Sequence, residues 1–303
     1  MRIITFTPKS APTSPPRVGA LLPDGTSVLN FAVAVDASAD VPLLSWFDLG
    51  DEWLIKARQI HDQLAKSAAR VETLPRGSVL PLADVVLGPP VPRPGKIICV
   101  GLNYKDHAAE SNMPVPTSPV TFSKYVTAVT APGAPIRLPA ASKEVDYEAE
   151  LAVVIGRRAK HVTAAQAWDC VLGYTNLNDV SARDLQFADK QWQRGKSCDT
   201  FAPMGPAIVT RDGLADPHRL RIQLRLNGQT MQDSSTEQLI FGVDTVIAFL
   251  SETVTLEPGD VIATGTPPGV GFARKPPVYL KPGDIVEVEV EGLGVLSNPV
   301  VSD

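Results

Sequence analysis

The most restrictive feature of this chain of 303 residues is a proline-rich segment near the end of its first third. Residues 88–95 read Gly-Pro-Pro-Val-Pro-Arg-Pro-Gly, so four prolines and two glycines fall within eight positions. Proline has no backbone N–H and fixes its own φ, so this segment can continue neither a helix nor a central strand. The sequence therefore predicts a small N-terminal domain over residues 1–90 and a larger domain over residues 95–303.

The patterns on both sides of this segment predict an α+β fold with a mixed or rolled sheet. A Pro-Asp-Gly-Thr turn signal at 23–26 separates two short apolar runs, which is typical of a hairpin. Two Pro-Gly-Asp turns, at 258–260 and 282–284, each precede a strand pattern. Helices are expected over about 52–70, 163–172 and 239–250. Strands and helices do not alternate regularly, which disfavours a Rossmann or barrel architecture.

Composition and charge exclude several classes of protein. Hydrophobic residues make up 44% and charged residues 20% of the chain, as in ordinary globular proteins. The net charge is −5 and no basic tract stands out, so we expect no nucleic-acid and no membrane partner. The three cysteines are far apart, and the first residues lack a long apolar segment. These observations predict a cytoplasmic protein without a disulfide framework.

Two carboxylates, Glu148 and Glu150, lie two positions apart in an otherwise apolar strand pattern. Side chains alternate faces along a strand, so both should point the same way, where like charges repel each other and lose hydration. A divalent cation between them would remove both penalties, and Asp179 offers a third carboxylate at the end of another expected strand. Oxygen ligands alone suit Mg²⁺, Mn²⁺ or Ca²⁺ better than Zn²⁺. The alternative is a set of surface charges on an edge strand.

His107 and Glu110 form a second candidate pair. They are three residues apart, so on a helix they share a face. A carboxylate can orient an imidazole, and such a dyad can activate water as a general base. The alternative is an ordinary surface pair, and this spacing alone does not decide between the two.

Two loop segments carry further candidates. Residues 195–197 are Gly-Lys-Ser, but Lys190 stands where a P-loop requires glycine, so that motif is absent. Lys196 can still pair with a substrate carboxylate or a developing oxyanion, unless it is a solvated loop lysine. Residues 263–271 hold two threonines and three glycines, so their backbone amides near Gly265 and Thr266 can approach a bound anion. The alternative there is a tight surface connection.

Taken together and in this order, the motifs resemble the fumarylacetoacetate hydrolase superfamily. The resemblance covers about residues 96–300. It is carried by residues 100–104 with His107 and Glu110, and by residues 146–151, 178–184, 195–197 and 264–271. The chain is similar to the two-domain bacterial members rather than to the longer fumarylacetoacetase itself.

The resemblance implies a β-roll catalytic domain, usually in a homodimer, with a small N-terminal α+β domain. It implies Mg²⁺ or Mn²⁺ bound by Glu148, Glu150 and Asp179. It also implies catalytic roles for His107, Glu110 and Lys196, and substrate-binding roles for Arg183, Gln186, Gly265 and Thr266. A loop over the site is expected at residues 111–121.

The expected substrate is a small 2-oxo acid. The leading interpretation is metal-dependent hydrolysis of a C–C bond in an acylpyruvate or related 2,4-dioxo acid, through a metal-stabilised enolate, because the dyad can supply the water. The same enolate arises when oxaloacetate loses CO₂ or changes between keto and enol forms. The alternative is therefore a decarboxylase or tautomerase acting on oxaloacetate or a related 2-oxo dicarboxylic acid. A third interpretation is a catalytically silent metabolite-binding protein.

Overall fold

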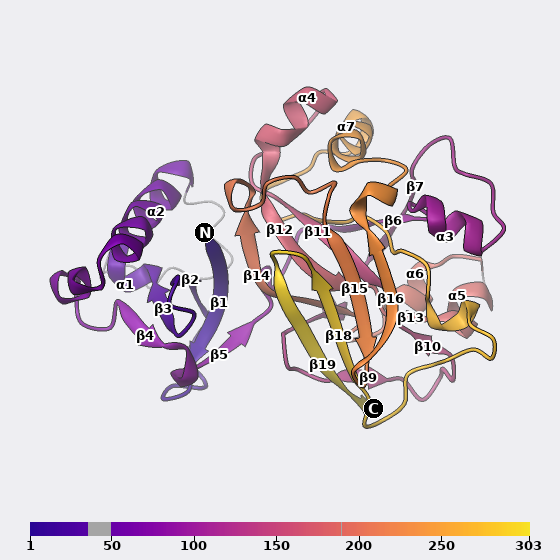
Figure 1. Ribbon diagram of the computed structural model, residues 1–303, viewed down its shortest axis with the longest axis horizontal. Coiled ribbons are helices and arrows are strands. Elements are labelled where there is room, and N and C mark those ends of the chain that lie inside the picture. The colour runs from indigo at the N-terminus through magenta and orange to yellow at the C-terminus, as the bar shows by residue number, and fades with distance from the viewer. Residues whose placement is uncertain (36–49, 189) are drawn as a thin grey trace.

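One mixed sheet of twelve strands runs through the molecule and contains strands of both the N-terminal part and the larger part (Figure 1). The computed structural model describes residues 1–35, 50–188 and 190–303. In spatial order the strands are β4 (Val79–Pro81), β3 (Ser27–Asn30), β2 (Arg17–Leu21), β1 (Arg2–Pro8), β14 (Ala202–Thr210), β12 (Val171–Asn178), β11 (Ala149–Ile155), β17 (Val261–Ala263), β6 (Ile97–Gly101) and β7 (Val120–Lys124). Beside them, β5 (Val85–Gly88) pairs with β1, and β8 (Val129–Thr130) pairs with β14.

The N-terminal part contains β1 to β5 with α1 (Phe31–Val35) and α2 (Gly50–Lys66). The hairpin expected around residues 23–26 is confirmed, since β2 and β3 flank that turn and pair with each other. Residues 89–96 link β5 to β6 without a helix or strand, as the prolines require. This part is not isolated, because β1 pairs with β14 of the larger part at Arg2↔Val209 and Ile3↔Ile208. The division into two domains stays a prediction.

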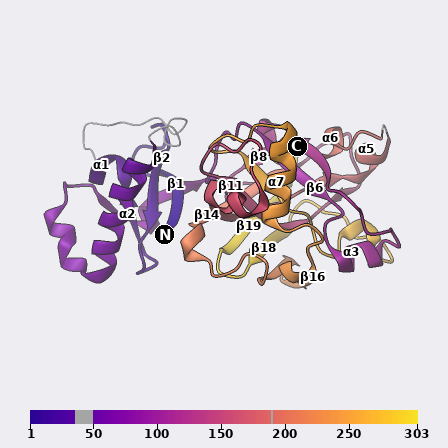
Figure 2. The same ribbon diagram turned by 90° about the horizontal axis from the view of Figure 1, so that it is seen from above.

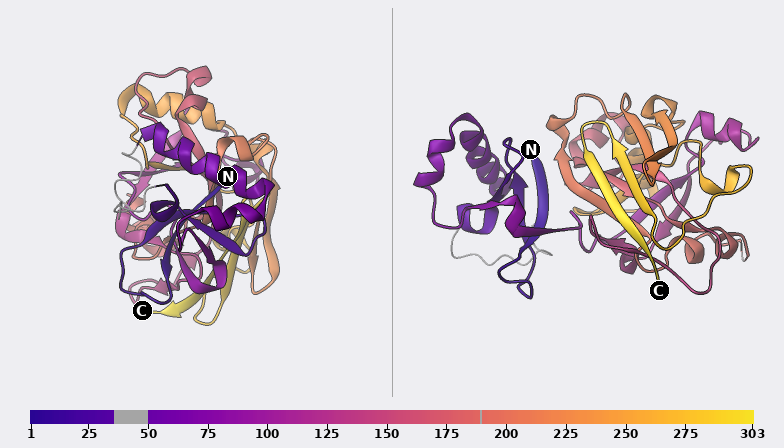
Figure 3. Two further views of the ribbon diagram at one scale, coloured as in Figure 1. Left: turned by 90° about the vertical axis from the view of Figure 1, so that its left-hand side faces the viewer. Right: turned by 60° about the horizontal axis from the view of Figure 1, so that its bottom comes forward.

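A second sheet packs in the larger part (Figure 3). Its order is β16 (Gln229–Ser235), β15 (Arg221–Leu226), β18 (Ile285–Val290), β19 (Gly294–Ser302) and β9 (Ile136–Leu138). The Pro-Gly-Asp turns precede β17 and β18, as expected. Most neighbours are antiparallel, but β6 with β17, β8 with β14 and β9 with β19 are parallel. The predicted α+β fold with mixed sheets is confirmed, and the described strands form no closed barrel.

Two helices differ from the sequence expectation. A capping box at Thr163 starts α4 (Ala164–Ala167) as predicted, and a 3₁₀ turn (Trp168–Cys170) continues it. The helical stretch ends shortly before the predicted residue 172, because β12 begins at Val171 and pairs with β11. The helix expected over 239–250 is α7 (Val243–Thr253). Its predicted first turn is extended instead, because Leu239 pairs with Tyr104. In the part of the chain that the structure describes, no helix combines the length and apolarity needed to cross a bilayer.

The central strand β11 determines where the candidate acids lie. All seven of its residues are buried between β12 and β17. Glu148 precedes β11 by one residue, but the Asp179 N–H donates to its carbonyl at 2.9 Å and extends the pairing with β12. The short helices α3 (Lys105–Glu110), α5 (Arg183–Ala188) and α6 (Gln193–Lys196) gather at the end of the molecule opposite the N-terminal part (Figure 1, Figure 2).

Candidate functional site

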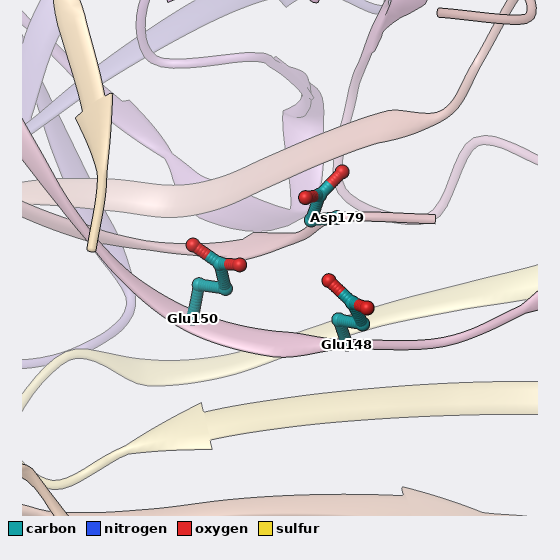
Figure 4. A group of neighbouring side chains, drawn as sticks. All are labelled: Glu148, Glu150 and Asp179. Atoms are coloured by element: carbon teal, nitrogen blue, oxygen red, sulfur yellow. The ribbon is translucent and has the colours of Figure 1, made fainter. Parts of the chain in front are cut away.

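The three predicted metal ligands converge. Glu148, Glu150 and Asp179 are all buried, and one carboxylate oxygen from each lies within 4.8 Å of the other two. Figure 4 shows the three side chains pointing toward one another from two neighbouring segments of the sheet. The donor set contains only carboxylate oxygens, which is the chemistry that hard divalent cations prefer. The surface-charge alternative is therefore wrong, and the triad can hold a divalent cation.

The two glutamates have opposite electrostatic settings. Burial pulls the pKa of Glu148 up, but the Lys196 ammonium and the Arg183 guanidinium outweigh it and lower that pKa to about 2. Burial raises the pKa of Glu150 well above its usual range, and the Asp179 and Glu148 carboxylates raise it further. The Lys196 ammonium and one hydrogen bond, donated at 2.8 Å by the Gly265 N–H, oppose this rise without cancelling it. A bound cation would stabilise the ionised form of Glu150 most of all.

Three buried cations hold the acids in place. Lys196 Nζ donates to Glu148 Oε2 at 2.7 Å and to Asp179 Oδ2 at 2.8 Å. Burial lowers the pKa of Lys196, but Asp179 and Glu148 raise it above its ordinary value. Lys124 Nζ at the end of β7 also donates to Asp179. Arg183 Nη2 donates to Glu148 Oε1 at 2.5 Å.

Arg183 connects the acid cluster to the cavity wall. Its Nε donates to Asp146 Oδ2 at 2.9 Å, its Nη1 donates to Gln186 Oε1 at 3.0 Å, and its guanidinium lies 4.4 Å from the Phe272 ring centroid. Burial would lower the pKa of Arg183, but Glu148 and Asp146 raise it above its usual value. With Asp146 included, four carboxylates face three cations, so the cluster has one excess negative charge when all four carboxylates are ionised.

The loop over residues 263–271 uses its backbone amides on protein carboxylates. Gly265 N–H donates to Glu150, Gly269 N–H donates to Glu110 at 3.1 Å, and Gly271 N–H donates to Asp146 at 2.7 Å. The sequence expectation was that these amides approach a bound anion. Gly265 has φ +102°, and a Cβ there would lie 2.8 Å from the Asn103 Cβ, so glycine is required.

His107 and Glu110 form the expected dyad on α3. His107 Nδ1 lies 3.1 Å from Glu110 Oε2, which leaves Nε2 available to another partner. His107 is buried, and the Gly269 N–H donates to both carboxylate oxygens of Glu110, at 3.1 and 3.2 Å. The dyad is therefore anchored on two segments and is not an ordinary surface pair.

A cavity of about 460 Å³ collects these groups. The predicted residues that line it are His107, Glu110, Glu148, Glu150, Asp179, Arg183, Gln186, Lys196 and Thr266. Gly265 is not among the lining residues. Ser111, Asn112 and Met113 also line the cavity, so the beginning of the expected loop over the site lies against it. The roles assigned to all these residues stay predictions.

A larger depression of about 710 Å³ lies along β7 and shares Phe122 and Trp192 with this cavity. Among the residues that the structure describes, no carboxylate lines it. The smaller cavity combines acids, cations and a histidine dyad with an apolar rim, so the chemistry belongs there.

Sequence reasoning missed two members of the site. Lys124 looks like the end of an ordinary strand, and only the fold brings it to Asp179. Asp146 was part of a recognised motif without a role, yet it is fully buried and accepts from Arg183, Gly271 and Phe272. One sequence signal could have identified Asp146, because a carboxylate at the start of an apolar strand pattern needs a partner. Nothing comparable marked Lys124.

Comparison with known families agrees with this geometry. Residues 96–301 match the family described as fumarylacetoacetate (FAA) hydrolase, C-terminal. The chain belongs to this family. The matched residues include the whole acid cluster, the dyad and the loop over 263–271.

Relatives along the whole chain carry a more specific name. The chain is 45% identical over 303 residues to the Xenopus laevis protein named oxaloacetate tautomerase fahd2, mitochondrial, covering 99% of this chain and 90% of that protein. It is also 45% identical over 303 residues to the human protein named oxaloacetate tautomerase FAHD2A, mitochondrial, covering 99% and 92%.

Solved structures of the superfamily have the same fold. The fumarylacetoacetate hydrolase of Exiguobacterium antarcticum superposes with a TM-score of 0.82 at 35% identity, covering all of both chains. The 2-hydroxyhepta-2,4-diene-1,7-dioate isomerase of Mycobacterium marinum gives 0.74 at 37% identity, covering 100% of this chain and 99% of that one. The family fold therefore hosts both hydrolases and isomerases.

The expectation of a cytoplasmic protein is contradicted by the relatives. The Xenopus and human proteins are both named mitochondrial. The expectation used the free cysteines as its main argument. Unpaired thiols indicate a reducing compartment but do not distinguish one such compartment from another.

We predict that Glu150→Gln removes most of the stabilisation that Mg²⁺ gives the wild-type protein. At about 100 times its Kd, Mg²⁺ should stabilise the wild type by about 2.7 kcal/mol. Without metal, the difference in stability between the wild type and Glu150→Gln depends on pH. The raised pKa of Glu150 favours folding at low pH, and this stability is lost as pH rises through the folded-state pKa, whereas glutamine stays neutral. In EDTA, the melting temperature of the wild type should therefore fall relative to that of Glu150→Gln as pH rises.

Thermal unfolding with Mg²⁺ and with EDTA, from pH 5 to pH 9, measures both effects. Glu252→Gln, at an exposed position on α7, is the matched control. An equal rise in melting temperature with Mg²⁺ for Glu150→Gln and the wild type would contradict the prediction.

Proposed function

We propose that this protein is a divalent-metal-dependent keto–enol tautomerase acting on oxaloacetate or a closely related 2-oxo dicarboxylic acid. The observation that carries the proposal is the 45% identity across 99% of the chain to proteins named oxaloacetate tautomerase, together with a cavity that holds an acid triad and a histidine dyad. Mg²⁺ and Mn²⁺ fit the all-carboxylate donor set, and Ca²⁺ could take their place.

The proposed chemistry has two proton transfers: one proton is removed from carbon and one is added to oxygen. A bound divalent cation would supply Lewis-acid stabilisation of negative charge on the 2-oxo oxygen. Glu110 orients His107 through Nδ1, so Nε2 can take a proton from C3 of the keto form. A proton is delivered to the C2 oxygen, and the compound keeps its composition. Lys196 keeps a positive charge beside the acids and so favours the anionic intermediate.

The charges in the cavity support a substrate with a second carboxylate. Arg183 and Lys196 are already bonded to protein carboxylates, so neither is free to balance a distal anion. Lys275 also lines the cavity, is exposed, and has no ion pair among the described residues. It is therefore the cation available to the far carboxylate of oxaloacetate. Acylpyruvates with an apolar tail carry no charge there.

Hydrolysis of an acylpyruvate is the second candidate. The dyad favours it, because Glu110 and His107 could activate a water molecule as well as accept a carbon-bound proton. Decarboxylation of oxaloacetate would use the same stabilised anion. A product assay on oxaloacetate and acetylpyruvate, with Mg²⁺ or EDTA, separates these reactions.

We infer that a second copy of the chain binds along β7. This strand lies at the edge of the large sheet, where unpaired backbone groups are available. Val120 on β7 and Tyr125 just after it are 47% and 56% exposed. Exposed apolar side chains beside an open strand edge support a homodimer.

His107→Asn should slow oxaloacetate tautomerisation by about 10²–10⁴-fold, because it removes the proton carrier while keeping a polar side chain of similar size. EDTA should reduce the rate of the wild-type protein to a comparable level. Ultraviolet absorbance of the enol form follows the reaction directly. His161→Asn, at an exposed position outside the cavity, should leave the rate unchanged. Cleavage of acetylpyruvate at a higher rate than tautomerisation of oxaloacetate would contradict the proposal.

Lys275→Met should raise the KM for oxaloacetate about two- to fivefold with little change in kcat, since an exposed ion pair contributes modestly to binding. The KM for pyruvate enolisation should not change, because pyruvate has no second carboxylate. Lys281→Met, a nearby lysine outside the cavity lining, controls for net charge. Equal KM changes for both substrates would argue against this role for Lys275.

Light scattering should give twice the mass of one chain, and Val120→Glu should shift the protein toward monomer by adding charge to the strand edge. Val86→Glu, at an equally apolar position on β5 that is 56% exposed, is the control. A wild-type protein that stays monomeric at every concentration would rule out this interface.

A further inference from the structure

Gln232 is a buried amide outside every motif that the sequence analysis identified. It lies on β16, is 1% exposed, and reaches two parts of the candidate site at once. Its Oε1 accepts from the Ala149 N–H at 2.8 Å, between Glu148 and Glu150. Its Nε2 donates at 2.8 Å to both the Pro267 carbonyl and the Thr266 Oγ1.

The backbone fixes which way this amide points. The Ala149 N–H can only donate and the Pro267 carbonyl can only accept, so the oxygen and nitrogen of Gln232 cannot be exchanged. The amide nitrogen has two hydrogens, and both are used. The Thr266 oxygen must therefore act as the acceptor in its bond with Gln232.

This assignment determines what Thr266 offers to the cavity. Thr266 lines the cavity, and no protein group among the described residues accepts its hydroxyl hydrogen. With its oxygen already engaged, the hydroxyl is left with a hydrogen to donate. The ligand atom that complements it is a hydrogen-bond acceptor, and a charged carboxylate or enolate oxygen accepts more strongly than a neutral hydroxyl oxygen.

We propose that Gln232 is a positioning residue that makes Thr266 a hydrogen-bond donor to the substrate. The inference rests on the proposed function and adds a specificity rule to it. The site selects an anionic oxygen at Thr266 over a neutral hydroxyl group. Because the same amide also holds Ala149, it fixes the place of that donor relative to the carboxylates of Glu148 and Glu150.

A double-mutant cycle between Gln232→Met and Thr266→Val tests the inference. Calorimetric titration of the full chain with oxaloacetate in Mg²⁺ gives Kd, since a tautomerase interconverts two forms of one compound and binding is measurable at equilibrium. Each single variant should weaken binding about tenfold, which is the loss of a hydrogen bond to a charged group. The double variant should bind no more weakly than Thr266→Val alone.

Controls separate positioning from folding. Thr266→Ser should restore binding, and Gln229→Met, an exposed position on the same strand, should have no effect. If Gln232→Met does not fold, Gln232→Glu replaces it, because a glutamate carries at most one side-chain hydrogen and cannot serve both Thr266 and Pro267. Losses that multiply in the double variant, or an unchanged Kd in the Gln232 variant, would overturn the inference.

The outcomes for the two proposals are distinct. Turnover of oxaloacetate by the wild-type protein without a Gln232 effect overturns this inference alone. Binding without turnover, combined with the expected cycle, overturns the proposed function alone.

Discussion

A carboxylate that is buried without a cationic partner of its own is the constraint on which the site depends. Glu150 lies inside a fully buried central strand, and its hydrogen-bond partner among the described residues is the Gly265 N–H. Ionisation there is opposed by burial and by two neighbouring carboxylates. Three cations neutralise the other acids of the cluster, so the remaining charge is what a divalent cation would balance. The buried charge of Glu150 therefore affects both the stability of this region and its chemistry.

The surrounding structure keeps that charged cluster in one arrangement. Asp146 accepts from Arg183 and from the backbone amides of Gly271 and Phe272, at the end of the loop over 263–271 and just after it. The same loop reaches Glu110 and Glu150. These hydrogen bonds link the acids, the dyad and the loop into one network. A network in which several elements share the carboxylates positions reactive groups more firmly than isolated pairs would.

The sequence predicted those parts of the site that depend on local geometry. The spacing of Glu148 and Glu150 along a strand, and of His107 and Glu110 along a helix, placed each pair on one face. Asp179 joined them only as a candidate, because its approach depends on the pairing of β11 with β12. The counter-ion Lys124 comes from an edge strand more than fifty residues away, and no local pattern encodes that contact.

Fold predictions failed where tertiary pairing outweighed a local signal. The capping box at Thr163 formed, and the helical stretch ended at Cys170 rather than at 172 because β12 begins at Val171. The amides of the glycine-rich loop were expected to approach a bound anion, and those of Gly265, Gly269 and Gly271 donate to carboxylates of the protein. A sequence identifies an amide-rich loop but not which anion occupies it. The reaction itself was also beyond local patterns, since hydrolases and isomerases of this family share the fold.

The most direct test of the central claim is the binding of Mn²⁺, followed by electron paramagnetic resonance of the free ion. The account predicts one saturable site per chain, displaced by Mg²⁺ and lost in Glu150→Gln. Saturable binding that survives in Glu150→Gln, or the absence of saturable binding in the wild type, would contradict it.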